Sequence, residues 1–251
     1  MFLSNWWKWK CITPPRNKGI ELATTPFITF LDPDNEAVNE GYTKLYQSII
    51  EQDVDIVIGN IIKADKNCRE VNYFKSVYEC FPQQNIFTQQ HAAEILLDTS
   101  FKSQSIQAMM MKKSFLLERK LKMVEGVVGE DTLYFWEVLY NAQSFATINE
   151  IIHIYFAGVE GSSVNNITLQ TFLKYKKIEE RKLEFLQNHS LLDEYLALRF
   201  SYYFNNWYLK KWNRMKEYDK DQAKEVLKDI LEMYLPYMQE HQKHEWHLLM
   251  R

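Results

Sequence analysis

Two short acidic motifs hold the residue types best suited to chemistry in this sequence. Asp32-Pro33-Asp34 follows the apolar run 27–31. Two carboxylates one residue apart in a tight turn can bind a cation such as Mg²⁺ or Mn²⁺, which prefers oxygen ligands and accepts a diphosphate as co-ligand. Asp, Pro and Asn are also common turn residues, so this motif alone favours a surface turn.

The second motif, Glu130-Asp131, opens the predicted helix 130–141. A helix N-terminus keeps a carboxylate ionised near neutral pH, and an ionised carboxylate can accept a proton from a hydroxyl group. Acidic residues also cap helices without any catalytic role. Taken alone, the second motif favours capping.

Strand and helix patterns alternate over the part of the chain that contains both motifs, which predicts an α/β domain with a mostly parallel sheet and flanking helices. Ligands bind at the carboxyl ends of strands in such sheets, where Asp32 is expected. The predicted strands are 27–31, 54–62, 105–111 and 145–156, and the predicted helices are 16–23, 36–51, 88–97 with Thr88 as cap, 113–120 and 130–141. Segment 67–87 shows no regular pattern.

From residue 168 onward only helical patterns remain, at 168–188, 191–212 and 219–234. The sequence therefore predicts an all-helical C-terminal appendage. Its aromatic residues recur at helical spacing and are expected to pack against neighbouring helices, although a membrane or polymer contact is an alternative. These residues are Tyr195, Leu198, Tyr202, Leu209 and Trp212. His241, His244 and His247 could share a helix face and bind a metal, but a solvated helix end is the simpler interpretation.

Together and in this order, the motifs resemble family 2 glycosyltransferases of the GT-A fold. The resemblance rests on RNKGIELATTPFITFLDPDN at 16–35, on the stretch 109–155 around Glu130-Asp131, and on Gly161-Ser162-Ser163. It covers residues 14 to about 165. It implies an incomplete GT-A-like sheet, with the domain at 14–165 preceded by a leader at 1–13 and followed by the helical part at 166–251.

The resemblance also implies a role for each residue of the two motifs. Asp34 would hold Mn²⁺ or Mg²⁺ on the donor diphosphate, and Asp32 would contact the donor's ribose or sugar. Asp131 would be the general base on the acceptor hydroxyl, and Glu130 would support it or bind the acceptor. The activity would be an inverting, single-displacement transfer.

Three further residues have expected places in this scheme. Arg16 and Asn17 would lie beside the donor. His153 is a candidate additional metal ligand, although its position on a strand favours a packed, hydrogen-bonded histidine.

The sequence departs from the family pattern in its N-terminal part. Asn35 stands where many relatives have an acid, and residues 1–15 match neither of the two strands that bind the nucleotide base in the family. If the codons of Trp6-Trp7-Lys8-Trp9 are read one base later, they encode a glycine-rich segment. We therefore hypothesise that the leader is out-of-frame translation, and we expect little or no sugar transfer from the chain alone.

Composition excludes some functions and leaves others open. The net charge of −3 gives no support to a nucleic-acid partner. Three cysteines indicate a reducing compartment, so we expect a cytoplasmic protein, with contact to the inner face of the membrane or self-association through the helical tail as further options.

The leading hypothesis is a glycosyltransferase that uses a nucleotide-sugar donor and a glycan, polyol-phosphate or glycoprotein acceptor, in the building of surface polysaccharide or teichoic acid. The main alternative is a non-catalytic remnant that binds a partner through its helical tail. A nucleotidyltransferase is a third option, but Glu130-Asp131 and the lack of a basic glycine-rich loop count against it.

Overall fold

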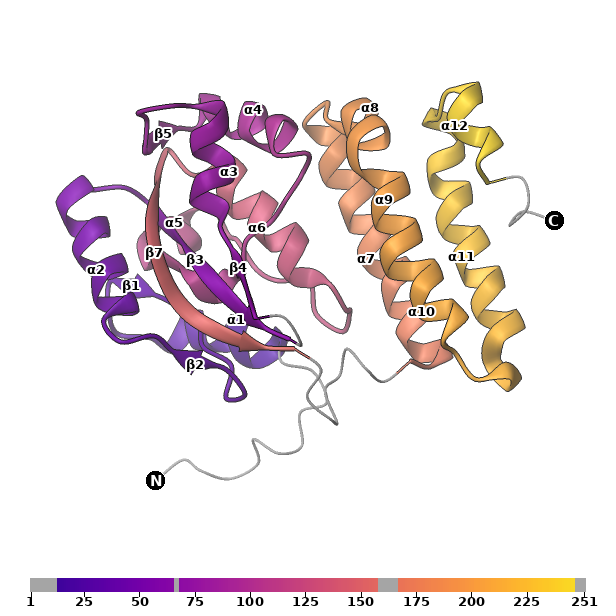
Figure 1. The fold of residues 1–251 in the computed structure, drawn as a ribbon, viewed down its shortest axis with the longest axis horizontal. Coiled ribbons are helices and arrows are strands. Elements are labelled where there is room, and N and C mark those ends of the chain that lie inside the picture. The colour runs from indigo at the N-terminus through magenta and orange to yellow at the C-terminus, as the bar shows by residue number, and fades with distance from the viewer. Residues whose placement is uncertain (1–12, 66–67, 158–166, 247–251) are drawn as a thin grey trace.

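The computed structural model describes residues 13–65, 68–157 and 167–246. A curved sheet with helices on both faces forms the first part, and a bundle of helices stands beside it (Figure 1). This confirms the predicted α/β fold with a helical C-terminal part. The strands are β1 (Phe27–Ile28), β2 (Glu36–Ala37), β3 (Ile56–Ala64), β4 (Arg69–Val71), β5 (Ile86–Thr88), β6 (Met109–Lys112) and β7 (Ser144–Phe156).

The sheet is mixed, which corrects the expectation of a mostly parallel one. Its order is β1-β6-β3-β7-β2, with β4 on β3 and β5 on β7. Only β3 and β7 run parallel, and the other recorded pairs are antiparallel. A parallel pair needs a long crossover, which residues 65–143 supply, whereas β3 and β4 are joined by a short connection and must be antiparallel.

The two faces of β3 belong to two different cores, because side chains alternate along a strand. Ile56 and Ile58 pack into the larger core, and Val57 and Ile61 into the smaller one. Helix α2 (Gly41–Gln52) covers the smaller core with Leu45 and Ile49. The larger core is covered by α1 (Thr13–Leu22), α3 (Tyr73–Cys80), α4 (Gln90–Asp98), α5 (Lys113–Glu118) and α6 (Glu130–Asn141).

Several local expectations were wrong because pairing within the sheet overrode local pattern. Glu36–Ala37 forms β2 against His153 and Ile154 of β7, so the following helix begins only at Gly41. Thr88 ends β5 and α4 begins at Gln90. The segment 67–87, which showed no regular pattern in the sequence, contains β4, α3 and most of β5. Asn72 caps α3 by accepting a hydrogen bond from the Lys75 N–H at 2.6 Å.

The helical part begins with α7 (Leu169–Asn188), which packs against α6 and α11 (Lys220–Tyr234). A continuous helical run joins α8 (Leu192–Tyr195), η4 (Leu196–Phe200), α9 (Ser201–Tyr203), η5 (Phe204–Leu209) and α10 (Lys210–Asn213), and the chain continues through α11 to α12 (Glu240–His244). None of the helices in the described ranges combines the length and hydropathy needed to cross a bilayer.

The buried stripe of this run differs from the predicted one. Both η4 and η5 are π-helical, which widens each turn beyond the α-helical 3.6 residues. Buried side chains therefore recur every four residues, at Leu196, Phe200, Phe204 and Tyr208. Of the residues expected to pack, Tyr195 is buried, but Leu198 and Tyr202 are 47% and 59% exposed.

A buried ion pair lies inside the helical part. Lys182 donates to Glu179 at 2.7 Å, and each side chain is 1% exposed. Tyr208 and Tyr234 also donate hydroxyl hydrogen bonds to the Glu179 carboxylate. All these contacts satisfy a charge that would otherwise be costly to bury.

Candidate functional site

Helix α1 brings Arg16 and Asn17 into the protein interior. It begins at Thr13, three residues before the predicted start, because Pro14 and Pro15 fit the first turn of a helix, where no N–H partner is lost. Arg16 is 8% exposed and Asn17 is 6% exposed. A buried arginine requires paired carboxylates, and the two acidic motifs supply them.

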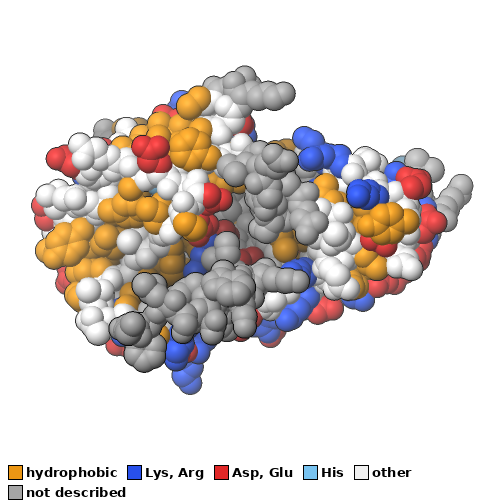
Figure 2. Space-filling model, turned by 90° about the horizontal axis from the view of Figure 1, so that it is seen from below, with side chains coloured by type: hydrophobic (Ala, Val, Ile, Leu, Met, Phe, Trp, Pro, Cys, Tyr) orange, Lys and Arg blue, Asp and Glu red, His pale blue; other side chains and the backbone are white. Residues whose placement is uncertain are grey.

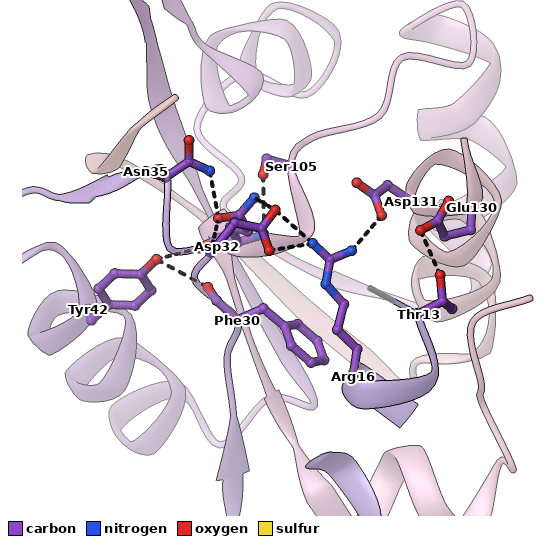
Figure 3. A network of polar contacts seen from close by, with 10 residues as sticks. Thr13, Arg16, Phe30, Asp32, Asn35, Tyr42, Ser105, Glu130 and Asp131 are labelled. Carbon is purple, nitrogen blue, oxygen red and sulfur yellow. Dashed lines mark hydrogen bonds and ion pairs between the residues drawn. The ribbon is translucent and has the colours of Figure 1, made fainter. Parts of the chain in front are cut away.

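Arg16 joins the two motifs (Figure 3). Its Nη2 donates to both carboxylate oxygens of Asp32, at 2.6 and 2.9 Å. Its Nη1 donates to Asp131 Oδ1 at 3.0 Å. Burial lowers the pKa of the Arg16 guanidinium, but the carboxylates of Asp131, Asp32 and Glu130 outweigh it and the net shift is upward. The structure therefore places Asp32 and Asp131 on the same side of the sheet, around one cation.

Gln107 holds the turn that contains Asp32. Its Oε1 accepts the backbone N–H of Asp32 at 2.7 Å, and its Nε2 donates to Asp32 Oδ2 at 3.0 Å. Asn35 also donates to Gln107, and Tyr42 donates to the Gln107 carbonyl at 3.0 Å. Gln107 was missed in the sequence, although one signal was present: it is the only polar residue in the otherwise apolar run 106–111.

Glu130 and Asp131 are the first two residues of α6. Thr13, also missed in the sequence, donates to Glu130 Oε1 at 2.8 Å. Gly129 precedes them with φ of +89°, in the left-handed region that glycine favours. A β-carbon at Gly129 would lie 3.6 Å from the Tyr203 hydroxyl, so the helical part closes against the start of α6.

Asp131 has the electrostatic properties of a base that works near neutral pH. The pKa of its carboxyl is raised to about 6, because desolvation, together with the nearby Glu130 and Asp32, outweighs the opposing effect of Arg16. Because 48% of the side chain is exposed, solvent screens part of this effect. A general base is most effective when its pKa lies near the working pH.

Asn17 is engaged by a different segment. It donates to the Met123 carbonyl at 2.9 Å and to Glu125 at 3.0 Å, and it accepts the Met123 N–H at 2.9 Å. These bonds fasten the connection between α5 and α6 to α1. The expected donor contact of Asn17 stays a prediction.

Asp34 is exposed and lies within electrostatic reach of Tyr155, as Asp32 and Asp131 also do. Burial and these three carboxylates together raise the pKa of the Tyr155 hydroxyl. Within the described ranges, no three acidic, histidine or cysteine side chains gather in a way that could hold a metal ion. Both oxygens of Asp32 accept hydrogen bonds from Arg16, and Oδ2 also accepts one from Gln107.

His153 is fully buried on β7. Neither ring nitrogen has a hydrogen-bond partner in the described part of the chain, which differs from the hydrogen-bonded histidine expected. Burial lowers the pKa of His153 to about 4, against an opposing effect of Asp32. The role of His153 as an additional metal ligand stays a prediction.

The surroundings of the site can be followed in Figure 2. Seen from below, acidic and basic side chains lie together in a hollow of the sheet part, near the middle of the molecule. Residues 1–12 of the Trp-rich leader, Gly161-Ser162-Ser163 and His247 fall outside the described residues. His241 and His244 lie on α12, within no potential metal cluster of the described ranges.

Comparison with known proteins gives one family match and several similar folds. The family model described as glycosyl transferase family 2 matches residues 14–115, which contain Arg16, Asp32 and Asp34. No curated protein matches the sequence.

Solved structures of TarS from S. aureus share the fold. TarS 1–349 in complex with UDP-GlcNAc is 18% identical with a TM-score of 0.59, covering 87% of this chain and 60% of that one. TarS 1–349 in complex with UDP is 16% identical with a TM-score of 0.55, covering 87% and 59%. The chain thus spans about 60% of the length of these structures. The chain thus matches the model of glycosyl transferase family 2 over residues 14–115, less than half of its length, and shares a GT-A-like fold with TarS.

Proposed function

We propose that the chain is a glycosyltransferase that moves a sugar from a nucleotide-diphosphate donor to an acceptor hydroxyl by inverting single displacement. The observation that supports this most is the Arg16 bridge, which brings the Asp-x-Asp turn and Asp131 into one site. The family match over the first motif and the UDP and UDP-GlcNAc bound to TarS support the donor class.

In the proposed reaction the acceptor oxygen attacks the anomeric carbon of the donor sugar. The new carbon–oxygen bond forms as the bond to the diphosphate breaks, and the hydroxyl proton passes to Asp131. Arg16 orients the Asp131 carboxylate through its 3.0 Å contact, and Thr13 fixes Glu130 beside it. A base held in this way loses little freedom when the acceptor arrives.

On the donor side we propose Asp32 as the contact to ribose or sugar and Asp34 as the protein's ligand for Mn²⁺ or Mg²⁺. Asp34 is exposed and can join a cation whose other ligands come from diphosphate oxygens and water. Such a cation would offset the charge on the departing diphosphate. The acceptor, a glycan, polyol-phosphate or glycoprotein at the cytoplasmic face of the membrane, follows from the family resemblance alone.

Donor binding tests this proposal even if turnover is slow. The chain would be titrated with UDP-GlcNAc in the presence and absence of Mn²⁺ by calorimetry. The supporting result is micromolar binding that needs Mn²⁺ and is lost in Asp34→Ala. The control is Asp98→Ala, which removes an exposed aspartate elsewhere on the sheet part and should keep donor binding. Asp131→Asn should bind donor normally and lose transfer.

A second candidate function, binding of a protein partner without catalysis, is favoured by one observation. Strand β1 ends the sheet and pairs only with β6 in the described ranges, and hydrophobic side chains lie exposed near it. Leu31, Tyr46 and Ile50 are 44%, 49% and 49% exposed. Absence of donor binding by a chain with a sharp thermal transition would favour this function over sugar transfer.

A further inference from the structure

Two leucines lie exposed on neighbouring helices at a distance from the carboxylate site. Leu22 on α1 is 67% exposed and Leu117 on α5 is 47% exposed. A shallow apolar cavity of about 90 Å³ lies between the two helices, lined by Ile20, Leu116, Leu117 and Leu121 with parts of Asn17, Glu21, Lys120 and Lys122. We call residues 18–22 and 113–122 the α1–α5 face.

Basic residues surround these leucines. The α1–α5 face contains Lys18, Lys113, Arg119, Lys120 and Lys122 against Glu21 and Glu118, a net charge of +3 in a chain whose net charge is −3. A local positive charge on an acidic protein orients it toward anionic surfaces.

The internal ion pairs leave part of this charge available. Glu21 is engaged by Lys18 at 3.0 Å and by Lys122 at 2.9 Å. Lys113 donates to the backbone carbonyls of Glu21 and Ala23, and so fastens α5 to the end of α1. No carboxylate of the described ranges lies within ion-pair distance of Arg119 or Lys120, and both are exposed.

We propose that the α1–α5 face docks on an anionic lipid surface. Leu22 and Leu117 enter the boundary between headgroups and acyl chains, and the basic side chains extend to the lipid phosphates. A soluble anionic polymer would need the charges but not two exposed leucines.

This docking surface is independent of the sugar-transfer proposal but would affect it. Leu22 lies six residues beyond Arg16 on the same helix, roughly 9 Å along the axis. Docking would therefore hold the Asp32–Asp131 site close to the lipid headgroups.

Vesicle co-sedimentation of the full chain tests the proposal. We expect binding to vesicles that contain phosphatidylglycerol, little binding to phosphatidylcholine alone, and release by salt. Removing two charges in Arg119→Gln/Lys120→Gln should lower partitioning by roughly five-fold per charge. Leu117→Ser should lower it as well.

The chain offers matched controls on its helical tail. Arg214→Gln/Lys216→Gln removes the same two residue types from an exposed segment, and Leu198 has the same 47% exposure as Leu117. These controls should bind as the parent does. All variants should melt at the temperature of the parent. The proposal would be overturned if the controls lost vesicle binding, or if the α1–α5 variants bound vesicles as strongly as the parent.

Two other outcomes would also overturn it. One is an absence of binding to phosphatidylglycerol vesicles at low salt. The other is equal binding to soluble polyphosphate that is unaffected by Leu117→Ser, which would indicate a polyanion site.

Discussion

Arg16 Nη1 lies 3.0 Å from Asp131 Oδ1, although 115 positions separate the two residues in the sequence. The same guanidinium holds both oxygens of Asp32, so one buried cation links the turn after β1 to the first residues of α6. A planar guanidinium can serve two carboxylates at once because its donors are fixed in a fork.

Replacing Arg16 should raise the pKa of Asp131 further. Arg16→Gln removes the charge that opposes the desolvation of Asp131, whereas Arg16→Lys keeps a charge that cannot reach both carboxylates in the same geometry. Carbon-detected NMR titration should give a pKa of about 6 for Asp131 in the parent. The pKa of Asp131 should be highest in Arg16→Gln and should lie between these two values in Arg16→Lys. Equal values in all three proteins would show that Arg16 does not control the base.

Glu137 should make stability depend on pH. The pKa of its carboxyl is raised from 4.5 to about 7, mainly because the group is buried. Arg181 lowers this pKa and Glu184 raises it, and both effects are included in the net value. Between these values the unfolded chain is ionised and the folded chain is protonated, so stability falls as pH rises through this window. Glu137→Gln should match the stability of the parent near the bottom of the window and exceed it by about 3 kcal/mol above the window.

Urea unfolding across this pH range provides the measurement for Glu137. Glu180→Gln, an exposed carboxylate on α7, is the control and should follow the parent at every pH. If the free energy of unfolding of Glu137→Gln changed with pH in the same way as that of the parent, the raised pKa of Glu137 would be contradicted.

The Glu179–Lys182 pair should show strong coupling. Lys182→Met or Glu179→Gln alone leaves the other group buried without its partner, which costs about 3–5 kcal/mol. The double variant should lose much less than the sum, because no unpaired charge remains. Unfolding free energies of the four proteins decide this, and additive losses would mean that the pair is not coupled.

Two glycines should respond in opposite directions to alanine. A β-carbon at Gly41 would lie 2.7 Å from the Ile152 carbonyl oxygen, so Gly41→Ala must push α2 away from β7 and destabilise the protein. Gly19 lies inside α1 with nothing within 4 Å, so Gly19→Ala should stabilise the protein by about 0.5–1 kcal/mol. Thermal denaturation distinguishes them, and a Gly41→Ala variant as stable as the parent would mean that α2 does not approach β7 so closely.

Local pattern was sufficient for much of the fold. The apolar runs of β3 and β7 and the amphipathic pattern of α6 depend on neighbours a few residues away, so their type could be predicted. The motifs and the segments between them pointed to glycosyltransferase family 2, and the model of that family matches residues 14–115, a range that contains the first motif. Asp32 and Asp131 were found because turn and helix-start chemistry is also local.

Tertiary structure decided what depends on distant partners. Strand direction, the pairing of Glu36–Ala37 with β7 and the four-residue stripe of the π-helical run follow from which surfaces meet in the folded chain. The contacts of Gln107 and the double use of Arg16 were not predictable, because each bond except that between Arg16 and Asp32 joins residues 65 or more positions apart. Buried polar groups take whichever partner the fold brings near, since leaving them unpaired costs more than any local preference supplies.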